Sequence, residues 1–504
     1  MPTTSRVPVS RLSSALAASK LSDGAVTARV IAAVTPLAVV AGVIPGGIAA
    51  TGKNSFPVVT VLIGVVFAVF SVSHLSAARR LSPADAGGFA GIIGRGLGGP
   101  AGVGAGWVAT LSYAILPIGL YGMIGGTVTP LLSRLFAVHV PWQLVAVPVV
   151  LLVGGLGLAH IATSTRVLVV LVVGELLMIA VVTAGNWLRP VPGGPQPAAL
   201  DPQLFSDGFP VAVAQLTLGV LGYIGTELTI LYTREARHGH RSIARATIAV
   251  ITTLTLLYFF CSAGLTVALG PGGLLATAQA DPGAVLATTT RANIGNTAAI
   301  VLSVLTATSL VAGAIAFHGA TARYAYFLGR HHAAPAAFGR PSRSYGTPIL
   351  ASVSQTALAL AAIVVVSVSG ADPARTLFYI GGSAASVGIL ILLALTALAT
   401  TVLFARARDR WWLTTSAAVS ALVLFGLAGA AAAGLDSLLG VPADSEVPAA
   451  LRIAYAVVFA GGAARAWWLR RRKTASYAAV TIPAECRELA VRPVPPATST
   501  PPAS

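Results

Sequence analysis

Residues 219–227 read Gly-Val-Leu-Gly-Tyr-Ile-Gly-Thr-Glu, which places three glycines and a carboxylate inside an apolar stretch that runs from 209 to 232. A stretch of this length crosses about 30 Å of hydrocarbon as one helix. Glycine destabilises a helix, and backbone groups that leave a helix inside a bilayer must find another partner. The segment therefore predicts a broken membrane helix whose freed N–H and C=O groups bind a ligand or an ion.

A second interruption lies in the first apolar stretch, 27–50, where residues 42–47 read Gly-Val-Ile-Pro-Gly-Gly. Proline lacks the backbone donor that a helix needs. The two interrupted stretches open two successive blocks of five helices, an order typical of inverted repeats with paired broken helices at the binding site. Glycine and proline also occur in continuous membrane helices, where they allow close packing, so packing is the alternative interpretation.

Composition places the whole chain in a membrane, because 56% of its 504 residues are hydrophobic and only 9% are charged. So few polar side chains cannot cover a water-soluble globule of this size. We therefore predict an all-α polytopic membrane protein with an even number of crossings. The expected helices are 27–50, 57–77, 101–129, 140–162, 166–187, 209–232, 243–269, 297–326, 347–369, 377–404, 411–434 and 447–469.

The net charge of +17 would suggest a nucleic-acid partner in a soluble protein, but its placement gives another explanation. With a cytoplasmic N terminus, 26 of the 32 Lys and Arg residues fall on the cytoplasmic side of the predicted topology. The positive-inside rule then predicts the cytoplasmic membrane with both termini in the cytoplasm. Residues 1–25 show no cleavable signal peptide, so we expect the first span to direct insertion, with lipid and not nucleic acid as the partner.

The spans predict five regions along the chain. Two five-helix repeats are followed by two further helices, and the last stretch is rich in Pro, Ser and Thr, which predicts disorder. The regions are a cytoplasmic tail 1–26, a first repeat 27–187, a second repeat 209–404, two additional helices 411–469 and a cytoplasmic tail 470–504.

Two carboxylates, Glu175 and Glu227, fall well inside predicted spans, whereas the other acidic residues lie in loops or tails. Burying an ionisable group in a membrane helix costs at least about 2.5 kcal/mol, so such groups usually face a transport pathway. Glu227 directly follows the predicted break of the sixth span. Both are candidates for proton coupling, and a protonated carboxyl group bonded to a neighbouring helix is the structural alternative for each.

Other polar groups in the spans give weaker signals. Tyr113 and Tyr121 in the third span lie eight residues apart and share a helical face, so they either line a cavity or pack as aromatic side chains. Paired Asp residues, HExxH and a Ser within reach of a His are absent from the spans, so we expect no enzyme activity. The two cysteines, Cys261 and Cys486, form no metal-binding spacing, and we expect neither a metal nor a cofactor.

Several motifs resemble the amino acid, polyamine and organocation (APC) superfamily, particularly its amino acid permeases, from the first span to about the tenth. The most specific is GYIGTELTILYTREARHGHRSIARATIAV from residue 222, which is similar to the family's Gly-aromatic-x-Gly-x-Glu followed by a basic loop. Pro45-Gly46-Gly47-Ile48 stands where the family has Gly-Ser-Gly-Ile. The stretch from Arg79, RRLSPADAGGFAGIIGRGLGGPAGVGAGW, resembles the Pro-x-x-Gly-Gly segment before the third helix.

The resemblance implies a five-plus-five inverted repeat of the LeuT/APC type, with broken first and sixth helices, working as a secondary transporter by alternating access. It also implies a substrate site at the two breaks, where backbone N–H groups hold a carboxylate and carbonyls accept from an ammonium group. The residues implied are Gly42, Pro45, Gly46, Gly47 and Ile48 in the first span, and Leu221, Gly222, Tyr223 and Gly225 in the sixth.

A departure from the family leaves the coupling ion open. The fifth helix carries Glu175 and no lysine of the kind that some proton-coupled relatives have, so H+ and Na+ both remain possible coupling ions. Proton symport of amino acids or amines is the first hypothesis, and an exchanger of the same substrates or a membrane sensor are the rivals. The short connection between the sixth and seventh spans disfavours a fold of two parallel six-helix halves.

Overall fold

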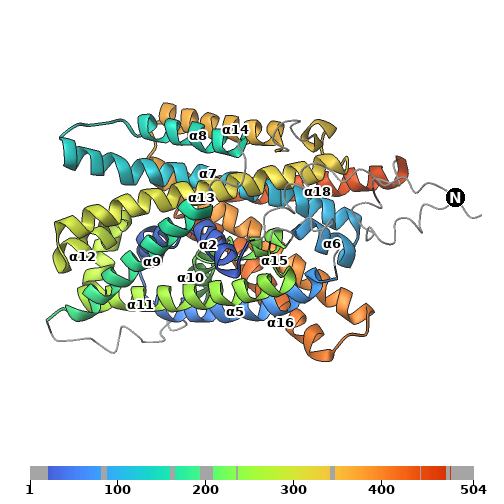
Figure 1. The fold of residues 1–504 in the computed structure, drawn as a ribbon, viewed down its shortest axis with the longest axis horizontal. Coiled ribbons are helices and arrows are strands. Elements are labelled where there is room, and N and C mark those ends of the chain that lie inside the picture. Colours follow the sequence, from blue (N-terminus) through green and yellow to red (C-terminus); the bar gives the residue numbers. More distant parts are fainter. Residues whose placement is uncertain are drawn as a thin grey trace, which may run out of the picture.

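The computed structural model describes residues 21–80, 88–158, 165–192, 208–233, 236–340, 347–442, 444–472 and residue 477 (Figure 1). Helices make up these segments. The labelled helices are α2 Asp23–Val34, α3 Pro36–Ala38, α4 Ile44–Thr51, α5 Phe56–Ala78, α6 Phe89–Leu97, α7 Gly99–Phe136, α8 Trp142–Leu158, α9 Thr165–Leu188, α10 Phe209–Leu221, α11 His240–Ala280, α12 Val285–Asn293, α13 Asn296–Arg330, α14 Ile349–Ser369, α15 Gly381–Arg406, α16 Trp411–Ala433, α17 Leu435–Leu439 and α18 Val447–Arg472. The short 3-10 and π elements are η1 Val39–Val43, η5 Thr226–Tyr232, η6 Pro282–Ala284, η7 Ala336–Gly339 and η8 Ala374–Ile380.

Eleven helices in the described segments are long and apolar enough to cross a membrane, and α8 is a shorter apolar helix beside them. The outer surface of these helices is apolar: Val368 is 84% exposed, Leu188 81% and Leu422 76%. Such side chains are favourable only where lipid surrounds them. The predicted polytopic protein with about twelve spans is confirmed.

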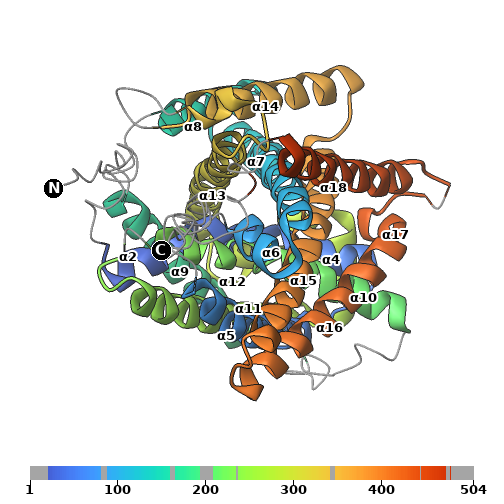
Figure 2. The ribbon, with the colours of Figure 1, turned by 90° about the vertical axis from the view of Figure 1, so that its right-hand side faces the viewer.

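The spans form one bundle in which α7 and α13 run side by side near the centre. Helix α8 pairs with α14 on one flank, α11 pairs with α5 on the other, and α18 packs on α7 (Figures 1 and 2). Helix α6 lies across one end of the bundle, between α7 and α15 (Figure 2). Seen from that end, α6 covers the middle of the bundle, where the two interrupted spans meet.

The sixth span is broken where the sequence predicts. Helix α10 ends at Leu221, a tight turn follows, and the chain resumes at Thr226 as the 3-10 helix η5. Gly225 has φ 111° and ψ −25°, a conformation that side-chain-bearing residues rarely adopt. The glycines of this segment therefore end the helix.

The first span is broken as well, but not at the predicted position. Helix α2 ends at Val34, Thr35 adopts a left-handed conformation with φ 54°, and Pro36 begins the second part. The residue before a proline is disfavoured in the α region, which explains an end at this point. The span then continues through η1 into α4.

The expectation that residues 42–47 unwind is therefore wrong. They lie in η1 and α4, and Pro45 stands in the first turn of α4, where its missing N–H costs little. A Cβ at Gly46 would lie 2.5 Å from the Tyr379 ring, and one at Gly47 would lie 2.3 Å from the Phe56 ring. These two glycines allow close packing, the alternative that the sequence left open.

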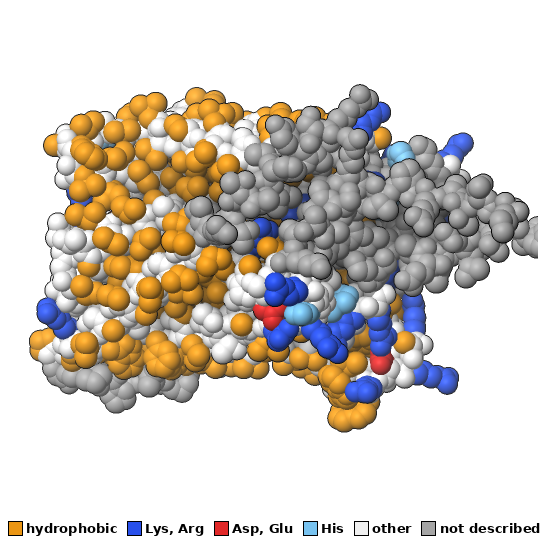
Figure 3. Space-filling model, in the orientation of Figure 1, with side chains coloured by type: hydrophobic (Ala, Val, Ile, Leu, Met, Phe, Trp, Pro, Cys, Tyr) orange, Lys and Arg blue, Asp and Glu red, His pale blue; other side chains and the backbone are white. Residues whose placement is uncertain are grey.

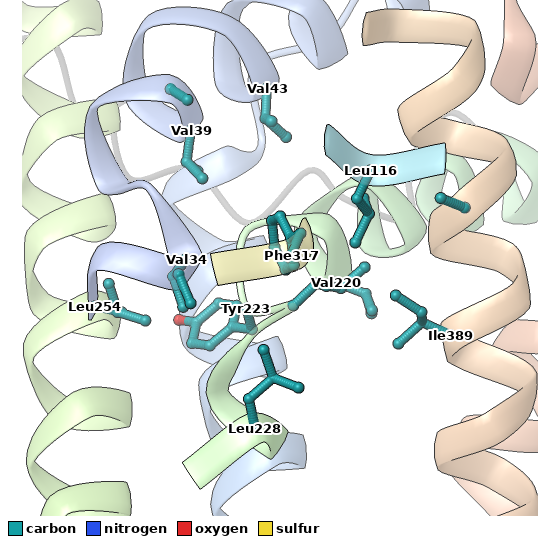
Figure 4. Packing of buried hydrophobic residues seen from close by; sticks show 14 of the residues in the cluster. Val34, Val39, Val43, Leu116, Val220, Tyr223, Leu228, Leu254, Phe317 and Ile389 are labelled. Carbon is teal, nitrogen blue, oxygen red and sulfur yellow. The ribbon is translucent and has the colours of Figure 1, made fainter. Parts of the chain in front are cut away.

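The two breaks touch each other. A Cβ at Gly225 would lie 3.2 Å from the backbone nitrogen of Val34, and one at Gly222 would lie 3.1 Å from Val39 Cγ1. Figure 4 shows Val34 and Val39 of the first span beside Val220 and Tyr223 of the sixth. The close approach depends on glycine at both positions of the sixth span.

We predict that Gly225→Ala destabilises the protein. The substitution places a Cβ at φ 111° against the backbone of α2, and strained backbone of this kind costs of the order of 1–3 kcal/mol. Thermal unfolding of the purified protein in detergent measures this as a lower melting temperature. Gly319→Ala is the matched control, because a Cβ there meets no atom within 4 Å, and an equal loss in both variants would contradict the prediction.

Candidate functional site

Glu227 closes the break of the sixth span. It stands in the first turn of η5, is 8% exposed, and its two carboxylate oxygens accept from the Gly225 N–H at 3.0 and 2.9 Å. The Tyr113 hydroxyl on α7 donates to the same carboxylate. One buried carboxylate thus ties the turn of the sixth span to the third span.

A stack of aromatic rings continues from this carboxylate toward α6. Tyr113 stacks on Tyr324 with ring centroids 5.3 Å apart, and Tyr324 stacks on Phe89 at 6.4 Å. Phe89 is the first residue of α6, and all three rings are buried. The stack fills the space between Glu227 and the end of the bundle that α6 covers.

Glu175 closes the break of the first span in the same manner. It projects from α9, is 3% exposed, and its Oε1 accepts from the Leu37 N–H at 2.7 Å and from the Ser309 hydroxyl at 2.6 Å. The first N–H groups after a helix start have no partner within the helix, and a carboxylate satisfies such a donor. Glu175 therefore holds the start of the second part of the span against α9 and α13.

Thr35, at the break itself, is held in an unusual conformation. A β-branched residue at positive φ is strained by about 1–3 kcal/mol, and such strain persists where the surrounding structure enforces it. Its hydroxyl donates to the Val34 carbonyl at 2.7 Å. A Cβ at Gly313 on α13 would lie only 2.1 Å from the Thr35 methyl group. Glycine at position 313 therefore leaves space for the Thr35 side chain.

A cavity of about 30 Å³ lies where the two breaks meet. Its lining comes from both interrupted spans and from α7, α13, η8 and α15, and Thr35 supplies the only polar side chain. The lining residues are Val34, Thr35, Ala38, Val39, Val43, Leu116, Gly119, Leu120, Leu221, Ile224, Phe317, Phe378 and Gly382.

The turn of the sixth span satisfies its own backbone beside this cavity. The N–H groups of Gly222 and Tyr223 donate to the Gly219 and Val220 carbonyls at 3.1 and 2.9 Å. The Ile224 N–H donates to the Leu221 carbonyl at 3.4 Å, the longest of the three bonds. A carbonyl has two lone pairs, so the oxygen of Leu221, a residue of the cavity lining, can accept from a second donor.

The predicted site residues divide into those near the cavity and those away from it. Leu221 lines the cavity, and Gly222 and Gly225 form the adjoining turn. Tyr113 does not line the cavity; its hydroxyl donates to Glu227, which in turn accepts from the Gly225 N–H of that turn. Tyr223 points elsewhere, because its hydroxyl contacts the Thr60 carbonyl and Thr255 Oγ1, both at 2.8 Å. The remaining predicted substrate-binding residues also lie outside the cavity lining: Gly42, Pro45, Gly46, Gly47, Ile48 and Tyr121.

The sequence interpretation missed several residues of the cavity. Thr35 could have been found from the sequence, since it precedes a proline inside an apolar span, and a helix commonly ends at such a residue. Phe317 and Phe378 could not have been found in this way, because the sequence pattern of an apolar helix does not distinguish an aromatic residue that lines a cavity from one that faces lipid. Within the described residues, no three His, Cys, Asp or Glu side chains come together as a metal site.

A model of the amino acid permease family, described as "Amino acid permease", matches residues 25–460 of the chain. The chain belongs to the amino acid permease family. The match includes both broken spans, the cavity and the two buried glutamates, and it confirms the resemblance found in the sequence. This permease is therefore a multi-pass membrane protein that transports amino acids, and not an enzyme. Comparison with curated proteins gives no match.

We predict that Glu175 of the permease acts through its hydrogen bonds and not through its charge. Glu175→Gln keeps an Oε1 that accepts from Leu37 and Ser309, so its melting temperature should stay close to that of the wild type. Glu175→Leu leaves the Leu37 N–H without its partner, at a cost of about 1–3 kcal/mol. Thermal unfolding compares the two variants, and a Gln variant as unstable as the Leu variant would contradict this role.

Proposed function

We propose that this permease moves amino acids across the cytoplasmic membrane by alternating access, together with protons, and that the substrate binds where its two broken spans meet. The observation that carries the proposal is the cavity of about 30 Å³ between Thr35 and Leu221, enclosed by both breaks. Broken helices bring backbone dipoles to the middle of the membrane, where a charged substrate has few other partners.

The two ends of an amino acid would find complementary groups at this site. When the protein opens, the Thr35 hydroxyl would turn from the Val34 carbonyl, to which it donates in this structure, and donate to the carboxylate. The Leu221 carbonyl, at the negative end of α10, favours the ammonium group. The rest of the lining is apolar, which favours amino acids with apolar side chains.

Entry to the site requires the protein to open, because a cavity of about 30 Å³ is far smaller than the roughly 300 Å³ of a small ligand pocket. On one side, Tyr113, Tyr324 and Phe89 fill the route toward α6. The half-helix α2 and the 3-10 helix η5 both end at the breaks, and a rotation of these two segments against α7 and α13 would open that route. Such a motion is the alternating access that we propose.

Glu227 is the residue that we propose for proton coupling. Both of its carboxylate oxygens accept from the Gly225 N–H, and one also accepts from Tyr113, so protonation turns one oxygen into a donor and leaves the other as an acceptor. A proton on Glu227 would therefore loosen the turn that carries the Leu221 carbonyl. Substrate binding and proton binding are linked through that turn.

The distribution of charge supports an orientation with both termini in the cytoplasm. In Figure 3 most of the visible Lys and Arg side chains gather toward the end of the bundle where α6 lies in Figure 1. Helices α5, α13, α15 and α18 all end there in arginines, at Arg79, Arg330, Arg406 and Arg472. This bias agrees with the positive-inside rule.

We predict that Glu227→Gln abolishes the response of uptake to a pH gradient but keeps exchange. In proteoliposomes, uptake of a 14C-labelled mixture of the protein amino acids is driven by an inside-alkaline gradient, and exchange is measured at equal pH against internal unlabelled amino acids. Gln cannot carry the proton but can still accept the Gly225 N–H. Glu175→Gln is the matched control, with both activities retained.

Two outcomes would contradict this prediction. A Glu227→Gln variant with undiminished pH-driven uptake would reject Glu227 as the coupling residue. A wild-type protein that takes up label only when amino acids are already inside the vesicle would make the permease an exchanger.

We also predict that Leu221→Trp blocks substrate binding. The larger side chain fills the cavity, so amino acids that raise the melting temperature of the wild type should no longer raise that of the variant. Leu216→Trp on the same helix is the control, because Leu216 is partly buried and lies outside the cavity lining. Equal thermal shifts in the wild type and in Leu221→Trp would place the site elsewhere.

A further inference from the structure

His74 is a buried titratable residue that the transport site described above does not use. It lies on α5, about one turn before the end of that helix, and is 5% exposed. Its ring stacks on Phe70 with centroids 4.9 Å apart and planes at 21°, so its orientation is fixed. Its Nδ1 is fully buried and has no hydrogen-bond partner in the structure.

A second small cavity connects His74 with Glu227. It has a volume of about 10 Å³, and its walls come from α5, η5 and α11. A cavity needs about 10–15 Å³ to hold one water, so this one is close to the smallest that can. Its lining residues are Phe67, Phe70, Ser71, His74, Leu75, Thr226, Glu227, Thr229, Ile230 and Thr247.

His74 and Glu227 are the only residues of this lining with acidic or basic side chains. Three of the four hydroxyl groups in the lining are engaged, since Thr226 donates to the Tyr223 carbonyl at 2.9 Å, Thr229 to the Thr226 carbonyl and Thr247 to the Ile243 carbonyl at 2.9 Å. The fourth hydroxyl belongs to Ser71. A water here would therefore find its strongest partners in the carboxylate and the imidazole.

We infer that His74 is the proton-transfer residue between Glu227 and the cytoplasm, acting through one water in this cavity. The inference rests on the proposed function, in which Glu227 carries the coupled proton. The position of His74 fits the role, because it lies between the break of the sixth span and the Arg-bearing end of α5. An apolar side chain would fill the space equally well, whereas the buried unpaired nitrogen is accounted for by a polar partner.

The transfer conserves protons and atoms. Protonated Glu227 gives its proton to the water, and the water gives one of its own to the unpaired nitrogen of neutral His74. The carboxylate and an imidazolium result, and the imidazolium then releases one proton to water on the cytoplasmic side. In the reverse direction, the same groups return a proton from the cytoplasmic side to the Glu227 carboxylate.

Charged groups on the adjoining elements stand apart from this cavity. None of them lines it, and two are paired: Arg80 with Asp409, and Arg245 with Asp23 at 2.9 Å. No titratable residue occurs in α10 or α16. The remaining titratable groups on α5, α11, α15 and η5 are Arg79, Tyr223 in the preceding turn, Tyr232, His240, Arg241, Tyr258, Cys261 and Arg406.

The test compares His74→Gln with the wild type in the two proteoliposome measurements, with the labelled amino acid mixture as the probe. Uptake driven by the pH gradient should fall at least about tenfold, because proton transfer by a positioned side chain contributes at least that much. Exchange at equal pH needs no net proton transfer and should stay within about twofold. In His74→Ala, imidazole added to the buffer should restore part of the pH-driven uptake.

His318→Gln is the matched control, since His318 is also buried but lies outside this cavity and bonds to Ser352 Oγ at 2.7 Å, a contact between a Ser and a His of two spans that the sequence did not predict. It should leave the ratio of pH-driven uptake to exchange unchanged. The inference is overturned if His74→Gln retains pH-driven uptake, or if it lowers uptake and exchange alike, as a packing defect would. If Glu227→Gln also responds normally to the gradient, the proposed coupling itself has failed.

Discussion

A backbone N–H or C=O that leaves a helix inside hydrocarbon needs another partner, and the arrangement of this permease depends on how two broken spans meet that need. At each break, a glutamate carboxylate accepts a hydrogen bond from a backbone N–H. Glu175 accepts from the N–H of Leu37 after the first break, and Glu227 accepts from the N–H of Gly225 in the second. The breaks can therefore exist at mid-bundle, and they contact each other through glycines.

The two glutamates differ in what surrounds them, and this difference separates their proposed roles. Glu175 is bonded to a backbone donor and to Ser309, and an amide oxygen at the same place can accept both bonds. Glu227 belongs to a chain of polar and aromatic groups that runs from the turn through Tyr113 on one side and toward His74 on the other. Under the proposed function, Glu175 stabilises the break of the first span, and Glu227 changes its protonation state as the protein moves.

Much of this organisation follows from sequence alone. Hydrophobic length predicted about twelve spans, and three glycines before Glu227 predicted the break of the sixth span at the right residues. The break of the first span was predicted at the wrong residues. Gly42 to Gly47 have the glycine- and proline-rich composition of a broken helix, but Gly46 and Gly47 instead allow the rings of Tyr379 and Phe56 to pack closely. Thr35-Pro36 breaks the span with a single proline.

The rest of the site could not be predicted because it depends on contacts between distant segments. Leu37 and Glu175 are 138 residues apart, and Tyr113 and Glu227 are 114 apart. Neither pairing follows from local periodicity. His74 reads as one polar residue near the end of an apolar helix, and only the packing of η5 against α5 brings it to the cavity beside Glu227.

The central claim is that the substrate binds between Thr35 and Leu221, where the two breaks meet. A cryo-electron microscopy structure of the permease with a bound amino acid tests it most directly. The account predicts density for the amino acid in the cavity lined by Val39, Leu116 and Phe317, with its ammonium group at the Leu221 carbonyl. Density at Gly46 to Ile48 instead, or no contact with either break, would contradict it.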